Sequence, residues 1–410
     1  MPDNNAVRAR VLLIGVDTPI GLAIVRELAG YGVEVHGIAR RASSIGLYSR
    51  HLTAGYVRTG AGSEWVVQAL DLARRLAPCH IMAISENDIC LLNEYREQFE
   101  GIRLLIPAPS KMKMVLDKST TNALAAEVGI SVPRTIKLDS IDQLDEKQFV
   151  AFPVILKWQD PNAVAKTLEA AQLPMEKAVY CHTYAELHNK LRSYRKIGIY
   201  PLIQEYCPGY GLGQFLFLHR GEVLLKFQHK RVNEWPPEGG FSSLCESLPP
   251  DLHADLLSQS IALLRKMDWE GPAMVEYRYD PTSGIARLME VNGRFWGSLP
   301  LAYHARAPFA WLTYSVLGNG ERVAVGEPQH GLRCRFMVPE IKRIARILFQ
   351  PQRIQDRTLK FSPAAEALRF FADFLSLRTR YYVFSLRDPK PFFADVYASC
   401  LRVASFRTRR

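Results

Sequence analysis

Residues 273–298 carry acidic and amide side chains at a spacing that suits a metal ion. Two alternating apolar runs flank residues 280–284, whose Pro, Ser and Gly are typical of a hairpin turn. Because side chains alternate faces along a strand, any even shift of register keeps Glu276 and Glu290 on one face, roughly 5–8 Å apart. Asn292 follows on that face. Two carboxylates and an amide oxygen suit Mg²⁺, which proteins usually hold through carboxylates together with substrate phosphates.

The register of this hairpin decides which side chains meet. The simplest pairing places Tyr279 opposite Ile285. Glu276 then lies opposite Leu288, which shares a face with Glu290. A solvated polar face at the edge of a sheet is the alternative to a metal site, and the spacing by itself leaves both open.

The same hairpin resembles a known family. Residues 290–298, EVNGRFWGS, resemble the metal-binding end of the ATP-grasp fold, in its carboxylate–amine ligase branch, which is similar to carbamoyl-phosphate synthetase. Gly293 stands where that branch usually has Pro, which loosens the loop but removes no ligand. The resemblance implies that Glu276, Glu290 and Asn292 bind Mg²⁺, or Mn²⁺ in its place, beside ATP.

Composition places the chain among globular proteins. It has 410 residues, 48% of them apolar and 23% charged, which suggests two or three domains. No apolar run approaches the roughly 18 residues that a membrane helix needs. The N-terminus lacks the apolar core of a signal peptide, and the seven cysteines have no CxxC spacing. We therefore expect a cytoplasmic protein with free thiols.

The first hundred residues predict a doubly wound sheet. A strand at residues 10–14, a Gly-rich turn, a helix at 22–31 and a strand at 33–38 form a βαβ unit. The turn lacks the GxGxxG spacing, and no acidic residue ends the second strand, so NAD(P) is not the favoured ligand.

A second candidate strand spans residues 80–84 and leads into the acidic residues 85–88. The resemblance implies a pre-ATP-grasp domain over residues 1–110, of the kind that often helps build the acceptor-substrate site. Alternatively, residues 85–88 only cap a helix that begins near Ile89.

Two lysines are the candidate phosphate ligands. By the resemblance, Lys118 contacts the α-phosphate, and Lys157, which closes a strand, contacts the α- and β-phosphates. Residues 158–164 lack the Gly-rich loop that commonly follows this lysine. Closure over the γ-phosphate therefore falls to another group, either Lys177 or the loop at residues 239–240.

Residues 201–209 resemble the hinge under adenine. The resemblance implies that Glu205 or a neighbouring carbonyl, with Tyr206 beside it, accepts from the adenine amino group. The backbone N–H of Cys207 would donate to the ring, and Ile155 and Met289 would sandwich it. An ordinary strand end before a Pro-Gly turn is the alternative, and no acidic ribose ligand is evident.

The acceptor side of the site is predicted around residues 229–243, a basic triplet followed by a Pro- and Gly-rich loop. Cationic side chains beside a metal–phosphate site suit an acyl phosphate. Arg294 is the first candidate to stabilise the acyl phosphate and its tetrahedral adduct, and Arg231 is the second. His229 could accept a proton from the attacking amine, although a structural or substrate-contacting histidine is the stronger alternative.

The positive charge is concentrated near the C-terminus. Residues 331–410 contain 17 Lys and Arg against 6 Asp and Glu, a net +11 that equals the net charge of the whole chain. Amphipathic helices are predicted at 341–348 and 366–377, packed on the core or on the partner of a homodimer. The second interpretation of this basic segment is a helix that lies on an anionic membrane. Binding to nucleic acid is the third, because no recognition motif accompanies the charge. The apolar face of the first helix would hold Ile341, Ile344, Ala345 and Leu348.

Three domains follow from these patterns. They are an α/β doubly wound parallel-sheet domain at 1–110, an α+β ATP-grasp domain of two subdomains at 111–326, and a basic, mainly helical extension at 327–410. The resemblance covers residues from about 10 to 326. It implies a ligase that joins a small-molecule carboxylate to an amine through an acyl phosphate, with release of ADP and phosphate. Carboxylation, phosphoryl transfer and a catalytically silent ATP-binding protein tethered by the basic segment are the alternatives.

Overall fold

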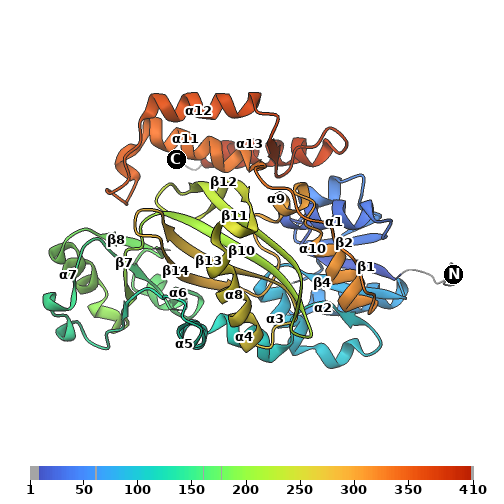
Figure 1. The fold of residues 1–410 in the computed structure, drawn as a ribbon, viewed down its shortest axis with the longest axis horizontal. Coiled ribbons are helices and arrows are strands. Elements are labelled where there is room, and N and C mark those ends of the chain that lie inside the picture. The colour runs from blue at the N-terminus through green and yellow to red at the C-terminus, as the bar shows by residue number, and fades with distance from the viewer. Residues whose placement is uncertain (1–8, 61, 160, 177, 408–410) are drawn as a thin grey trace.

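The structure is a computed structural model that describes residues 9–60, 62–159, 161–176 and 178–407. Three sheets lie side by side, with an N-terminal domain on one flank and a long twisted sheet in the middle (Figure 1). On the other flank lies the small subdomain predicted to bind the nucleotide, named the nucleotide subdomain below. Three helices near the C-terminus form a separate layer along one edge. Within the described residues, no helix combines the length and apolarity that a membrane crossing requires.

The N-terminal sheet is parallel, with the strand order β3-β2-β1-β4-β5 of a doubly wound domain. The predicted doubly wound parallel sheet is confirmed. Leu12 and Ile14 pack on one side of β1 and Val11 and Leu13 on the other, so both faces of the strand are buried. The strands are β1 Arg10–Ile14, β2 Val35–Ala39, β3 Ala54–Val57, β4 Cys79–Ala83 and β5 Arg103–Leu104, and the helices are α1 Pro19–Gly30, α2 Glu64–Arg75 and α3 Glu86–Glu94.

The helix expected near Ile89 begins earlier, at Glu86. Ser85 is its N-cap, and its hydroxyl accepts a hydrogen bond from the backbone N–H of Asp88. The cap at Ser85 is therefore confirmed, and the role of this acidic stretch in an acceptor-substrate site stays a prediction.

The nucleotide subdomain contains a four-stranded sheet of order β6-β9-β7-β8. Val154, Leu156 and Ile203 pack into its own small core, and Ile155 between them points to the opposite face of the sheet. Its strands are β6 Thr135–Ile136, β7 Val154–Lys157, β8 Val179–Cys181 and β9 Leu202–Glu205; its helices are α6 Pro161–Ala170 and α7 Tyr184–Ser193, and α4 Pro109–Leu116 and α5 Lys118–Glu127 precede it.

The central sheet has seven strands in the order β14-β13-β10-β11-β12-β15-β16. Its last two strands come from the C-terminal extension, which therefore completes the sheet rather than standing apart from it. The strands are β10 Tyr210–His219, β11 Glu222–Trp235, β12 Phe241–Leu248, β13 Gly271–Asp280, β14 Ile285–Asn292, β15 Arg333–Arg335 and β16 Thr379–Tyr381. The helices are α8 Ala254–Lys266, α9 Leu299–His304, α10 Phe309–Leu312, α11 Met337–Phe349, α12 Pro363–Leu375 and α13 Lys390–Arg407, and a π-helix spans Thr313–Gly318. Short 3-10 turns occupy Ile45–Tyr48, Arg96–Phe99, Ile141–Gln143, Glu146–Gln148, Arg195–Ile197, Pro250–His253 and Pro351–Arg353.

The predicted register of the β13–β14 hairpin is wrong by one residue. Tyr279 pairs with Ala286, not with Ile285, and a bulge then changes the register between Glu276 and Tyr277. Leu288 pairs with Tyr277 and is buried on the far face of the sheet, so it does not share a face with Glu290 as predicted. A bulge leaves no periodic signal in the sequence, which explains the error.

The predicted apolar face of α11 is also wrong. Ile341 and Leu348 are exposed, whereas Glu340, Arg343 and Ile347 are buried. Buried ion pairs to neighbouring elements decide which side of this helix faces inward, and periodicity alone does not reveal them.

Candidate nucleotide and metal site

The two carboxylates among the three predicted metal ligands lie directly opposite each other. Glu276 on β13 pairs with Glu290 on β14, and Met274 pairs with Asn292 two residues further along the ladder. Paired residues on neighbouring strands point to the same face, so the two carboxylates meet on one side of the central sheet.

Arg231 reaches this pair from β11, across the intervening strand β10. One of its terminal nitrogens lies 2.5 Å from the Glu276 carboxylate, and the other donates to the backbone carbonyl of Gly240 at 2.8 Å. The side chain passes over Gly211, where a Cβ atom would stand 2.6 Å from Arg231 Cδ. A glycine at this position therefore leaves room for the guanidinium to reach Glu276.

A second acidic residue, Glu234, holds the same arginine from the other side. It lies 3.2 Å from Arg231 and accepts from Arg278 at 2.7 Å. Burial acts to raise the pKa of Glu234, but the two arginines more than offset it and hold this pKa below its ordinary value. Sequence analysis did not single out Glu234, Arg278 or Gly211. Their closeness depends on strand pairing, and only the repeated glycines of β10 hint at it in the sequence.

The carboxyl group of Glu276 is in an environment that disfavours its charge. Burial raises the pKa of Glu276 above its ordinary value, and the carboxylates of Glu290 and Glu234 add to the rise. Arg231 opposes this rise without cancelling it. A divalent cation would relieve the repulsion, since it favours two neighbouring carboxylates in their charged form.

Glu290 shows the opposite balance. Burial again acts to raise its pKa, but a hydrogen bond from the Asn292 amide, 2.9 Å long, and nearby positive charges bring this pKa below its ordinary value. The charges come from Lys118, Arg231 and Arg294. Four of the predicted site residues thus act on the carboxylate of Glu290.

The oxygen atoms of the acidic pair and of Asn292 suit a hard cation that also binds phosphate oxygens. Among the described residues, no group of three or more His, Cys, Asp and Glu side chains could hold a metal ion without further ligands. Glu276, Glu290 and the amide oxygen of Asn292 supply oxygen donors, which suit Mg²⁺ when phosphate oxygens complete its shell. Their assignment as metal ligands stays a prediction.

The two predicted phosphate-binding lysines lie within electrostatic range of each other. Burial lowers the pKa of Lys157, and the charge of Lys118 lowers it further, while Glu290 acts in the opposite direction. The Lys157 ammonium donates to the side chain of Gln204 at 3.1 Å, and Lys118 is exposed at the first turn of α5. Two cations beside an acidic pair suit the charge of a polyphosphate chain, and the role of both lysines as phosphate ligands stays a prediction.

The predicted adenine hinge follows β9. Ile155 on β7 is buried and pairs with Gln204, and Glu205, which ends β9, forms an ion pair with Arg287. Burial raises the pKa of the neighbouring Cys207 thiol to about 11, so this thiol stays protonated near neutrality. Met289 is the extra residue of the β14 bulge and is half-buried.

A contact of Tyr206 was not anticipated. Its hydroxyl lies 3.0 Å from the hydroxyl of Thr358, and nearby the ring of His182 lies 3.0 Å from the carbonyl of Gln355. The segment between α11 and α12 therefore touches both the hinge and β8. Partners more than 150 residues apart give no local signal in the sequence.

Lys177 and the loop at residues 239–240 are the predicted candidates for closing over the γ-phosphate. Helix α6 begins at Pro161, in the stretch where a Gly-rich loop would commonly stand. Lys177 lies outside the described residues. The loop around Gly239 contacts the nucleotide subdomain, because the hydroxyl of Tyr180 donates to the carbonyl of Glu238.

His229 on β11 is buried against the central sheet, two residues before Arg231. Its ring stacks on Phe215 with centroids 4.7 Å apart, and Nε2 lies 2.8 Å from the hydroxyl of Ser298. Burial lowers the pKa of His229 to about 3, so the imidazole is neutral near pH 7. Its role as a proton acceptor stays a prediction, and its burial favours the structural alternative.

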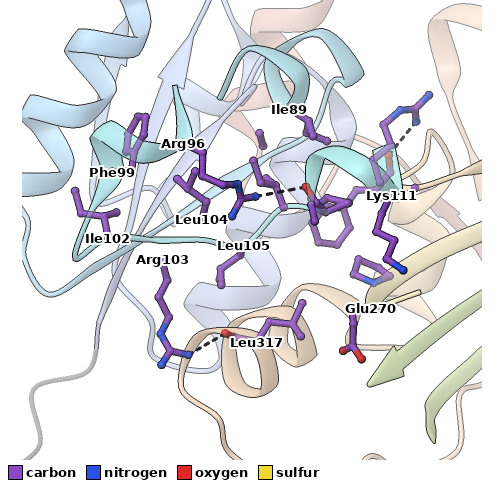
Figure 2. A pocket seen from close by; sticks show the side chains of 18 of the residues that line it. Ile89, Arg96, Phe99, Ile102, Arg103, Leu104, Leu105, Lys111, Glu270 and Leu317 are labelled. Carbon is purple, nitrogen blue, oxygen red and sulfur yellow. Dashed lines mark hydrogen bonds between the residues drawn. The ribbon is translucent and has the colours of Figure 1, made fainter. Parts of the chain in front are cut away.

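Arg294 joins the site to the N-terminal domain. Its guanidinium lies 2.9 Å from the carboxylate of Glu86 at the start of α3. It also lines a cavity of about 530 Å³ between that domain and the ends of β13 and β14. Figure 2 shows apolar side chains such as Phe99 and Leu105 in this cavity, with Arg103 donating to the carbonyl of Leu317. The predicted catalytic arginine thus acts on Glu290 of the acidic pair and also lines a partly open cavity whose wall is mainly apolar.

No protein-family model matches the chain, and no curated protein matches it either. Solved structures do. A biotin carboxylase from Campylobacter jejuni has a TM-score of 0.61 at 15% identity, over 80% of this chain and 75% of that one. The biotin carboxylase domain of a Hydrogenobacter thermophilus 2-oxoglutarate carboxylase, crystallised with MgADP and bicarbonate, has a TM-score of 0.60 at 14% identity, over 80% and 74%.

An L-amino acid ligase from Bacillus licheniformis is also similar, with a TM-score of 0.55 at 14% identity over 76% of this chain and 74% of that one. At such low identity the likeness concerns the fold. The ligase and the carboxylases are ATP-grasp enzymes, and the chain has the ATP-grasp fold, as residues 290–298 predicted.

Proposed function

We propose that this chain is an ATP-dependent ligase that joins a carboxylate to an amine through an acyl phosphate. The observation that carries the proposal is the direct pairing of Glu276 with Glu290 on a face that also holds Arg231. Lys118 and Lys157, whose charges act on this site, support a polyphosphate substrate. The fold, which L-amino acid ligase shares, agrees with such chemistry.

In the first step, ATP phosphorylates the carboxylate substrate, and different side chains bind the phosphate chain and the cation. Lys118 and Lys157 hold the phosphate chain, and Glu276, Glu290 and Asn292 hold the cation. Mg²⁺ bound there neutralises charge on the phosphoryl oxygens. An oxygen of the carboxylate substrate then bonds to the γ-phosphorus, the bond to the β-phosphate oxygen breaks, and ADP leaves.

In the second step the amine attacks the acyl carbon. The carbon–oxygen bond to the phosphate breaks with its electron pair, and inorganic phosphate leaves with an amide as product. Arg294 and Arg231 would stabilise the negative charge of the tetrahedral adduct. The amine loses a proton, for which the neutral imidazole of His229, through Ser298, and solvent are the candidate acceptors.

The apolar cavity beside Arg294 supports an organic substrate. Its volume of about 530 Å³ lies in the range of small-molecule pockets and far exceeds the needs of bicarbonate. Arg294 at its wall would hold the carboxylate end of a substrate whose apolar part fills the cavity.

An ADP-release screen over paired carboxylates and amines tests the proposal. We expect release of ADP and phosphate only when both substrates are present, and Glu290→Gln should lower turnover at least about a hundredfold. Glu222→Gln, which changes an exposed carboxylate at the start of β11, should leave turnover unchanged. Phosphate retained on the product would indicate a kinase, and ATP binding without release would indicate a silent binding protein.

Carboxylation is the second candidate, favoured by the likeness to two biotin carboxylases with TM-scores of 0.60 and 0.61. It requires bicarbonate as the group that ATP activates. ADP release that depends on bicarbonate and needs no organic carboxylate would favour carboxylation over amide formation.

A further inference from the structure

Helix α12 carries its apolar residues on the outside of the molecule. Leu368, Phe371 and Leu375 recur at helical spacing, and their side chains are 72%, 66% and 86% exposed. Leu377, just beyond the helix, is also exposed. Figure 1 shows α12 as the outermost element of the C-terminal layer, with α11 beneath it.

The inner face of α12 is held by charged and aromatic contacts. Glu366 accepts from Arg343 of α11 at 2.6 Å, and Asp373 accepts from Arg333 at 3.3 Å. The fully buried guanidinium of Arg335 lies 4.0 Å from the ring centroid of Phe370. These contacts fix the rotation of the helix, so the apolar stripe cannot turn inward without breaking the buried ion pair between Arg343 and Glu366.

The charges around the stripe are strongly one-sided. Every acidic residue between 331 and 399 is buried or half-buried. In the same described range, nine lysines and arginines are exposed. They include Arg369 within α12, which also pairs with Glu366 at 3.0 Å, and Arg378 just after the helix. The accessible surface of this layer is therefore apolar and cationic, without exposed carboxylates to balance it.

We propose that α12 docks the protein on an anionic lipid surface. Such a helix would lie in the membrane plane, with Leu368, Phe371 and Leu375 inserted between headgroups and the surrounding cations facing acidic phosphates. The apolar side chains would then leave water for the lipid, and the exposed lysines and arginines would lie against the lipid phosphates. This inference concerns location and stands whether or not the proposed ligase chemistry is correct.

Charge and apolar contact argue against a second copy of the chain and against nucleic acid as the partner of α12. A second copy of the chain, placed with its α12 against this one, would bring two cationic rims together without exposed acidic partners. Nucleic acid would match the charge but would leave the row of leucines and phenylalanine without apolar contact. An anionic bilayer matches both features.

Vesicle flotation with the full chain tests the proposal. We expect it to bind vesicles of phosphatidylcholine mixed with phosphatidylglycerol at least about tenfold more tightly than phosphatidylcholine alone. Binding should weaken as salt is raised. The double change Leu368→Asp with Leu375→Asp should reduce affinity for the anionic vesicles about a hundredfold. Arg378→Gln should weaken anionic binding severalfold and leave neutral binding unchanged.

Matched controls separate this effect from general loss of apolar surface. Val150→Asp changes an equally exposed apolar residue in the nucleotide subdomain and should leave vesicle binding intact. Leu375→Ser, a milder change, should weaken binding about tenfold, and thermal unfolding of each variant should match the parent chain.

Three results would overturn the proposal. The first is a parent chain that floats with neither vesicle. The second is a double variant that binds anionic vesicles as the parent does. The third is a dimer without lipid that the double variant converts to a monomer, because α12 would then be covered by a second copy.

Discussion

Exchanging Glu276 for Gln should separate metal binding from the stability of the sheet. Burial and two neighbouring carboxylates raise the pKa of Glu276, so its surroundings favour a neutral group. Gln is neutral and can still accept a hydrogen bond from Arg231. We therefore expect the free energy of unfolding of Glu276→Gln, measured without metal or nucleotide, to change by no more than about 1 kcal/mol. Turnover should nevertheless fall about a hundredfold, the usual effect of removing one electrostatic group from a catalytic site.

Glu234→Gln is the matched comparison, because it removes the same charge from the same cluster. Arg231 and Arg278 hold the pKa of Glu234 below its ordinary value, so its surroundings favour the charge. Its loss leaves two buried guanidinium groups with one partner fewer. We expect this variant to lose about 3 kcal/mol of unfolding free energy.

Urea unfolding and a coupled ADP-release assay on both variants measure these effects. The expected pattern is a stable Glu276 variant with little activity and a destabilised Glu234 variant. Equal destabilisation of the two would refute the analysis of their environments. Full turnover in Glu276→Gln would refute its assignment as a metal ligand.

Three shorter predictions concern the same candidate site. Gly211→Ala should displace Arg231, because the new Cβ would stand 2.6 Å from Arg231 Cδ, and lower kcat about tenfold with KM for ATP unchanged. Lys157→Met should raise KM for ATP at least about tenfold, since one charge-assisted hydrogen bond is worth about 1.5–3 kcal/mol. The Glu276 carboxyl, whose pKa is raised above its ordinary 4.5, stabilises the metal-free chain at low pH, and this contribution is lost as pH rises through the raised pKa. Because Mg²⁺ needs the charged form, the thermal shift produced by MgATP should grow over the same pH window and stay flat in Glu276→Gln.

Local patterns predicted much of the fold. Strand β1, the glycine turn after it and helix α1 all appear near their predicted limits, because each depends on a few consecutive residues. Strands β15 and β16 were missed. Each has three residues and is stabilised by pairing with a distant part of the chain, so neither carries a period of its own.

The site was predicted in part for a similar reason. Motif residues such as Glu276, Glu290 and Lys157 could be named from the sequence because they lie at characteristic places on strands. Glu234 and Thr358 could not, because their contacts with Arg231 and Tyr206 arise only when distant segments are brought together. A single sequence thus predicts the residues of a motif, but it does not predict the distant residues that contact the motif in the fold.

The bulge in β14 shows why the prediction of the acidic pair held although its register was wrong. Without a bulge, the observed turn pairing would place Met289 opposite Glu276 and turn Glu290 toward the far face. Met289 is the extra residue, and it returns Glu290 to the face of Glu276. A bulge of this kind commonly re-aims a side chain, here the one predicted to cover adenine.

Deleting Met289 tests what the bulge is for. The shortened strand would pair Leu288 with Tyr277 and Glu290 with Glu276 in regular alternation, so both carboxylates keep their face. If the bulge serves to present Met289 to adenine, KM for ATP should rise about tenfold, as expected for one lost apolar side chain, while kcat stays within a few-fold. Met289→Ala should give a similar rise. If deletion instead abolishes turnover and the thermal shift with Mg²⁺ while Met289→Ala does not, the bulge itself positions the carboxylates, and the adenine role of Met289 is wrong.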